Sequence, residues 1–100
     1  MLTDKLADWA AITLSVAKAT NTHRIDLLKE SRRYLAAIGE ANARKFDLDS
    51  DDRTHLNAAG SVVFGRMVSD LLVAEMGKPV ECVTKADKAL STKIRNGEMA

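Results

Sequence analysis

The chain has 100 residues, which is enough for one small domain. Fifteen basic residues against 14 acidic ones give a net charge of +1, so the balance of charge gives no reason to expect binding to nucleic acid or to an acidic membrane surface. The single cysteine, Cys82, excludes an internal disulfide and a cysteine-based metal cluster. No apolar run approaches the roughly 20 residues that span a bilayer, and no secretory signal pattern is visible. The sequence therefore does not indicate the cellular compartment of the protein.

The first third of the chain predicts a helix followed by a strand. Thr3 or Asp4 can cap a helix that ends near Thr20. From His23 to Leu27, apolar and polar residues alternate, which predicts one short strand. The residues of the helix that recur at helical spacing are expected to face a core, and they are Leu2, Leu6, Trp9, Thr13, Val16 and Ala17.

The remainder of the chain predicts further helices. Asp26 can cap a helix that ends at Gly39, and residues 40–46 can add a short turn. Asn57 can cap a long helix over residues 58–76, which Gly77 and Pro79 end. A last helix is predicted near residues 84–95.

Two glycines inside the long predicted helix, Gly60 and Gly65, each cost about 1 kcal/mol relative to alanine. We expect close approach of this helix to a sheet to explain them. The order helix, strand, helix, helix also fits a layered α/β domain. A lone strand would leave its backbone groups unpaired, so the chain is either an all-α bundle with a misassigned segment or the end of a larger α/β domain. We favour the second interpretation.

The densest group of polar side chains is the loop before the long helix. Four of the six residues from Asp47 to Asp52 are aspartates, and Asp52 stands three residues before His55. On this spacing alone, a loop histidine that Asp52 holds for structural reasons is the simpler interpretation. The same pair, Asp52 and His55, could also act as a general base with its orienting carboxylate.

The stretch Asp52-Arg53-Thr54-His55-Leu56-Asn57-Ala58-Ala59-Gly60 resembles the last sequence block of the SGNH (GDSL-like) hydrolases, in particular their rhamnogalacturonan acetylesterase-like members. Residues 61–72 resemble the closing helix of that subgroup, and the resemblance covers residues 2–77, with 78–100 as a tail. It implies an α/β fold: residues 1–100 would be a single partial domain, the C-terminal portion of a three-layer α/β/α, flavodoxin-like domain, mostly helical with one strand.

The resemblance also implies a function. Asp52 and His55 match the acid and base of the family's triad, and the reaction would remove acetyl groups from a polysaccharide such as pectin or rhamnogalacturonan. No metal or organic cofactor is implied. The family's nucleophile lies in a G-D-S block and part of its oxyanion hole in a G-x-N-D block, and neither block occurs in this sequence. Ser61, just behind the loop, is a poor substitute.

We therefore expect the isolated chain not to hydrolyse esters appreciably. The alternative is a catalytically inactive, truncated or interaction module. Such a module would pair an exposed sheet edge with a second copy or with an N-terminal half that carries the serine.

Two groups of residues carry part of the pattern of a metal site. Asp47, Asp49 and Asp51 have the spacing of the first calcium ligands of a loop, but Asp52 replaces the required glycine, so a solvated acidic turn is expected. His23 and His55 lack a third zinc ligand. The sequence therefore predicts no metal site.

Overall fold

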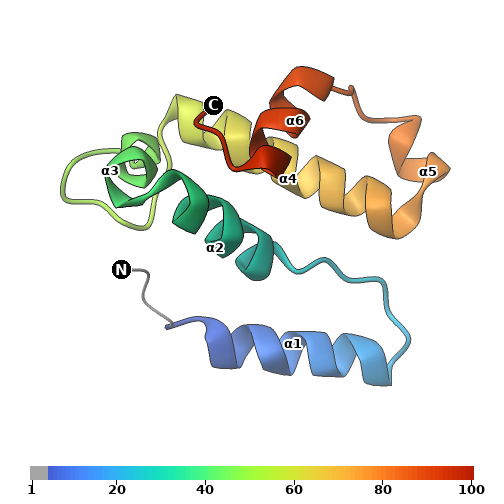
Figure 1. Ribbon diagram of the computed structural model, residues 1–100. Helices are drawn as coiled ribbons and strands as arrows, with labels where there is room; N and C mark the ends of the chain where they lie inside the picture. Colours follow the sequence, from blue (N-terminus) through green and yellow to red (C-terminus); the bar gives the residue numbers. More distant parts are fainter. Residues whose placement is uncertain (1–4) are drawn as a thin grey trace.

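The computed structural model describes residues 5–100, and within them every regular element is a helix (Figure 1). The elements in chain order are α1 (Ala7–Ala19), α2 (Leu27–Ile38), α3 (Glu40–Ala43), the 3₁₀ turn η1 (Arg44–Phe46), α4 (Ala58–Met76), α5 (Lys78–Glu81) and α6 (Lys88–Asn96).

The predicted α/β fold is wrong for this chain. Residues 22–26 form an irregular link between α1 and α2, and Leu27 already belongs to α2. A strand needs a partner for its backbone hydrogen bonds. The only β-type pairing in residues 5–100 is one isolated antiparallel bridge between Asp47 and Leu56. The all-α interpretation holds instead, and residues 5–100 contain no sheet edge through which an interaction module could pair.

The helix boundaries follow from local capping, largely as predicted. The Asp26 carboxylate accepts a hydrogen bond from the Lys29 N–H at 3.0 Å and begins α2, and Gly39, with a φ of 85°, ends it. Asn57 Oδ1 accepts from the Gly60 N–H at 2.8 Å and begins α4. The last helix begins later than predicted because Asp87 caps it.

The core lies where α2, α4 and α6 meet around η1. Tyr34 and Met67 are fully buried in it. The Tyr34 ring stacks on Phe46 with 6.4 Å between centroids, and its hydroxyl donates to the Glu98 carbonyl at 2.9 Å, which fastens the C-terminal tail to the core. The buried residues of this cluster are Tyr34, Ile38, Phe46, Val63, Met67 and Ile94.

Gly60 allows α4 to pack directly against η1. A Cβ at this position would lie 2.6 Å from the Phe46 carbonyl oxygen, so only glycine allows the contact. The predicted close approach therefore occurs, but to η1 rather than to a sheet. At Gly65 a Cβ would meet nothing within 4 Å, and the expectation for that glycine is wrong. The contact at Gly60 brings together the two ends of the loop that carries Asp52 and His55.

The expected burial of α1 is also wrong. Trp9 is 70% exposed and Leu6 is 62% exposed, and of the predicted core-facing residues that the structure describes only Ala17 is buried. The helix lies at the edge of the molecule, where no described element covers its outer side (Figure 1). Thr3, Asp4 and Leu2, which were predicted to cap the helix or to face the core, lie outside the described residues.

Candidate functional site

The loop that joins η1 to α4, residues 47–57, is closed at its base by backbone hydrogen bonds. The Leu48 N–H donates to the His55 carbonyl at 3.0 Å, and the Asn57 N–H donates to the Phe46 carbonyl at 2.9 Å. Phe46 is only 2% exposed and belongs to the core. The loop is therefore anchored at both ends to the best-packed part of the molecule.

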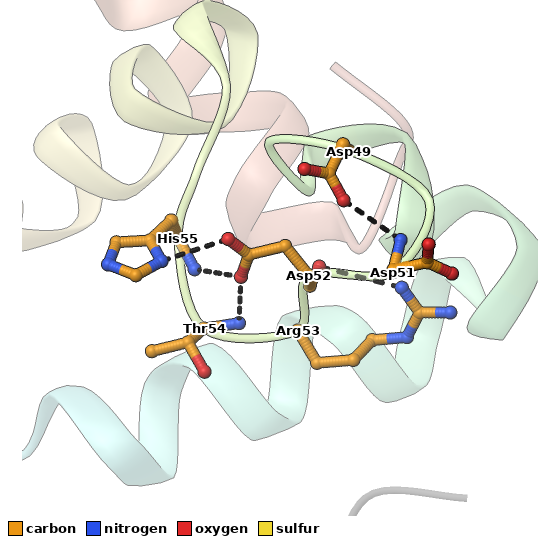
Figure 2. Close-up of a pocket in the computed structure, with 6 residues that line it drawn as sticks. All are labelled: Asp49, Asp51, Asp52, Arg53, Thr54 and His55. Atoms are coloured by element: carbon orange, nitrogen blue, oxygen red, sulfur yellow. Dashed lines mark hydrogen bonds and ion pairs between the residues drawn. The ribbon is translucent and has the colours of Figure 1, made fainter.

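Asp52 and His55 are in direct contact at the tip of this loop, as the sequence predicted. Asp52 Oδ2 lies 2.9 Å from His55 Nδ1 (Figure 2). The other carboxylate oxygen, Oδ1, accepts hydrogen bonds from the backbone N–H groups of Thr54 at 2.7 Å and His55 at 2.8 Å. With both oxygens occupied, the carboxylate is fixed in orientation and holds the imidazole through Nδ1.

These contacts keep Asp52 ionised. They lower the pKa of its carboxyl group from 3.8 to about 2, chiefly because the backbone N–H groups of His55 and then Thr54 donate to the charged form, with a further contribution from the His55 ring. A negative charge beside Nδ1 favours the tautomer in which Nδ1 carries the proton. In that tautomer the lone pair is on Nε2.

The neighbouring charged residues shape the turn. Arg53 Nη1 donates to the Ser50 carbonyl at 2.7 Å and to Asp47 Oδ2 at 3.1 Å. The Asp51 N–H donates to Asp49 Oδ1 at 2.9 Å. Two of the loop's aspartates therefore hold the turn through hydrogen bonds and an ion pair, which is consistent with the expected solvated acidic turn.

His55 is one of the residues that line a shallow hollow of about 420 Å³ at the loop tip, and Figure 2 draws these residues. The His55 side chain is 72% exposed, and its Nε2 has no hydrogen-bond partner among residues 5–100. The residues that line the hollow are Asp49, Asp51, Asp52, Arg53, Thr54 and His55. The His55 imidazole can accept a proton from an incoming group at Nε2, and it can return that proton.

The described residues place a carboxylate beside the imidazole but no hydroxyl group. No serine hydroxyl in residues 5–100 is hydrogen-bonded to the His55 ring. Ser61 lies exposed in the first turn of α4, and Ser50, which is nearer to His55 in sequence, lies exposed in the loop itself. A serine–histidine–aspartate triad is therefore not formed within residues 5–100.

His23 and His55 do not come together. His23 lies in the link between α1 and α2, and its Nδ1 is 3.1 Å from Glu75 Oε2 near the end of α4. Among the described residues no group of three or more histidine, cysteine, aspartate or glutamate side chains is arranged to hold a metal ion. The chain thus contains two separate histidine–carboxylate pairs, and only the Asp52–His55 pair borders the hollow.

The backbone donors that orient Asp52 were not predicted from the sequence. An aspartate that accepts from the N–H groups two and three residues later is a common local motif, so the sequence Asp-Arg-Thr-His could have indicated it. The ion pair of Arg53 with Asp47 was also missed, because it depends on how the loop folds back on itself.

No protein-family model, curated protein sequence or solved structure matches this chain. None of the helices in residues 5–100 is long and apolar enough to cross a bilayer. The fold and the site thus define a small helical unit that presents an oriented histidine–aspartate pair on an anchored loop.

Proposed function

We propose that this chain contributes the acid–base half of an ester hydrolase of the SGNH type, with an acetylated carbohydrate such as pectin or rhamnogalacturonan as the substrate. His55 is the general base and acid, and Asp52 orients it. The serine nucleophile and the oxyanion-hole donors come from another polypeptide segment. The observation that carries the proposal is the 2.9 Å contact between Asp52 Oδ2 and His55 Nδ1, with Nε2 directed to open solvent.

The chemistry follows from this geometry. A serine hydroxyl brought to His55 would give its proton to Nε2 as its oxygen attacks the acetyl carbonyl carbon. Asp52 stabilises the imidazolium that forms, and the same proton then passes to the oxygen of the departing sugar hydroxyl. Water, activated by the same nitrogen, hydrolyses the acetyl–serine ester and releases acetate.

The proposal explains why the isolated chain is expected to be inactive. An intact enzyme that loses one triad member keeps roughly 10³–10⁴-fold catalysis through its oxyanion hole and substrate binding. Neither of those parts is provided by an exposed loop with no serine at the imidazole. Hydrolysis of p-nitrophenyl acetate by the chain alone should therefore stay near the rate of the buffer.

The decisive experiment is complementation. The chain is mixed or co-expressed with the N-terminal part of a rhamnogalacturonan acetylesterase that retains its G-D-S and G-x-N-D blocks but lacks its own last block. Acetate release from acetylated rhamnogalacturonan should appear in the mixture and not in either component. A fluorophosphonate probe should label the serine of the added fragment only when this chain is present.

The matched controls use the two histidines. His55→Ala should abolish the complemented activity, and Asp52→Asn should reduce it by several orders of magnitude, because an amide favours the wrong tautomer. His23→Ala changes the other histidine–carboxylate pair and should leave the activity unchanged. A mixture no more active than its components, or an active mixture that tolerates His55→Ala, would show the proposal to be wrong.

A further inference from the structure

Glu75, near the end of α4, accepts hydrogen bonds from the link between α1 and α2. Its Oε2 lies 3.1 Å from His23 Nδ1 and accepts from the Arg24 N–H at 3.4 Å. Among residues 5–100, these are the hydrogen bonds that join the segment 5–26 to α4. One carboxylate oxygen therefore ties the link to a helix of the core.

The position of Glu75 within α4 indicates that this contact has a specific role. Because α4 ends at Met76, Glu75 lies in the last helical turn, where the backbone carbonyl groups carry partial negative charge and disfavour a carboxylate. The last turn of α4 has no basic residue to offset this effect. The link lowers the pKa of Glu75 below its usual range, chiefly because the His23 ring and then the Arg24 N–H donate to the carboxylate. The link therefore favours an ionised Glu75 where the helix itself does not.

Within residues 5–100, apolar packing holds α1 only loosely. No residue of α1 belongs to the core cluster, and the closest helix packing is that of α4 with α2, α5 and α6. A groove of about 410 Å³ lies between α1 and α2, and three of the four α1 residues that line it are alanines, which bury little apolar area. A helix of 13 residues is also marginally stable in water without tertiary contacts. A polar contact at the link can therefore decide whether α1 stays in place.

We propose that Glu75 acts as a latch for α1. While its carboxylate holds His23 and Arg24, α1 stays folded against α2. When this contact is lost, residues 5–22 become a hinged arm and α1 unwinds. Opening exposes the inner face of α1 and the side of α2 that borders the groove. The inference is independent of the proposed hydrolase function, because it uses no residue of the loop that carries the candidate site.

The hydrogen bonds on either side of the link place the hinge at residues 23–25 (Figure 1). On one side, the Thr22 N–H donates to the Ala17 carbonyl at 2.8 Å, so the chain up to Thr22 moves with α1. On the other side, the Asp26 carboxylate caps α2. Between them, the hydrogen bonds that residues 23–25 make within the described chain are those to Glu75. Loss of the latch therefore leaves three consecutive residues with no hydrogen bond to restrain them.

Amide hydrogen exchange followed by NMR tests the latch. In Glu75→Ala, the amides of α1 and of Arg24 should exchange about two- to fivefold faster than in the parent chain, which is the effect expected of a partly exposed polar contact. The core amides of Tyr34 and Met67 should be unchanged. The amides of α4 should exchange no faster, because the substitution removes a carboxylate that its last turn disfavours.

Glu81→Ala is the matched control, since it removes another exposed carboxylate from the neighbouring helix α5. It should leave the exchange of α1 as in the parent chain. Faster exchange of α1 in Glu81→Ala to the same extent as in Glu75→Ala would overturn the proposal, because the effect would then be one of net charge.

A double-mutant cycle isolates the contact itself. His23→Ala should accelerate the exchange of α1 less than Glu75→Ala does, because the Arg24 N–H keeps its acceptor. Added to Glu75→Ala, it should have no further effect, since the contact is already lost. Exchange of α1 that Glu75→Ala does not accelerate, additive effects in the cycle, or equal acceleration at Tyr34 and Met67 would each overturn the proposal.

Discussion

Gly60 and Gly65 provide a paired test of how α4 is seated on the rest of the molecule. Both glycines lie in the same helix, and in each case alanine gains about 1 kcal/mol of helix propensity. At Gly60 the new methyl group would lie 2.6 Å from the Phe46 carbonyl oxygen and 3.0 Å from the Phe46 Cβ. Backbone atoms cannot move aside cheaply, and overpacking of this kind costs about 3 kcal/mol, so Gly60→Ala should lose about 2 kcal/mol net.

Gly65→Ala meets nothing within 4 Å and should gain about 1 kcal/mol. For a domain of this size, the two changes correspond to a fall in Tm of roughly 8–16 °C and a rise of roughly 4–8 °C. Urea and thermal unfolding followed by far-ultraviolet circular dichroism measure both effects. Equal changes in Tm for Gly60→Ala and Gly65→Ala would refute the contact between α4 and η1. A Gly60→Ala chain as stable as the parent would refute it as well.

Three further predictions concern the core, the loop and acid. Tyr34→Phe removes the hydrogen bond to the Glu98 carbonyl and should cost about 1–2 kcal/mol in urea unfolding, with faster amide exchange in the C-terminal tail. Asn57→Ala removes the cap of α4 and the Nδ2 bond to the Lys45 carbonyl, and it should cost about 1–2 kcal/mol. Because folding lowers the pKa of Asp52 from 3.8 to about 2, its ionised form stabilises the folded loop above pH 3.8, and this contribution should disappear as the pH falls through about 2. Carboxyl-carbon NMR titration should give that pKa, and a value near 3.8 would contradict the geometry of the loop.

Features that depend on near neighbours in the sequence could be predicted. The caps Asp26 and Asn57 and the terminator Gly39 act within one helical turn, so residue type and spacing identified them. The contact between Asp52 and His55 is equally local, since the loop needs only to turn within three residues. The helix over residues 58–76 was placed for the same reason.

Features that depend on a distant partner could not be predicted. The alternating pattern at residues 23–27 is compatible with a strand, but a strand forms only if another strand lies beside it, and the described chain provides none. The apolar residues of α1 have the spacing of a buried face, and periodicity does not say whether this chain or another molecule covers that face. Gly60 indicated a close approach but not that Phe46 was the neighbour.

The proposed function also combines a local feature, which the sequence could predict, with a distant partner, which it could not. Asp52 and His55 form a local pair that resembles the acid and base of a family whose nucleophile is remote in sequence. The pair alone has the geometry of a proton relay, and its usefulness depends on what reaches the exposed Nε2. The state of the His55 imidazole is therefore the property that is most useful to measure.

The tautomer of His55 is the most direct test of the relay. Two-bond ¹⁵N–¹H NMR spectra, recorded at a pH where the ring is neutral, distinguish a protonated Nδ1 from a protonated Nε2. We predict a proton on Nδ1 and a lone pair on Nε2 in the parent chain, and loss of that preference in Asp52→Asn. A proton on Nε2 in the parent chain, or a tautomer that Asp52→Asn does not alter, would contradict the assignment of His55 as a base oriented by Asp52.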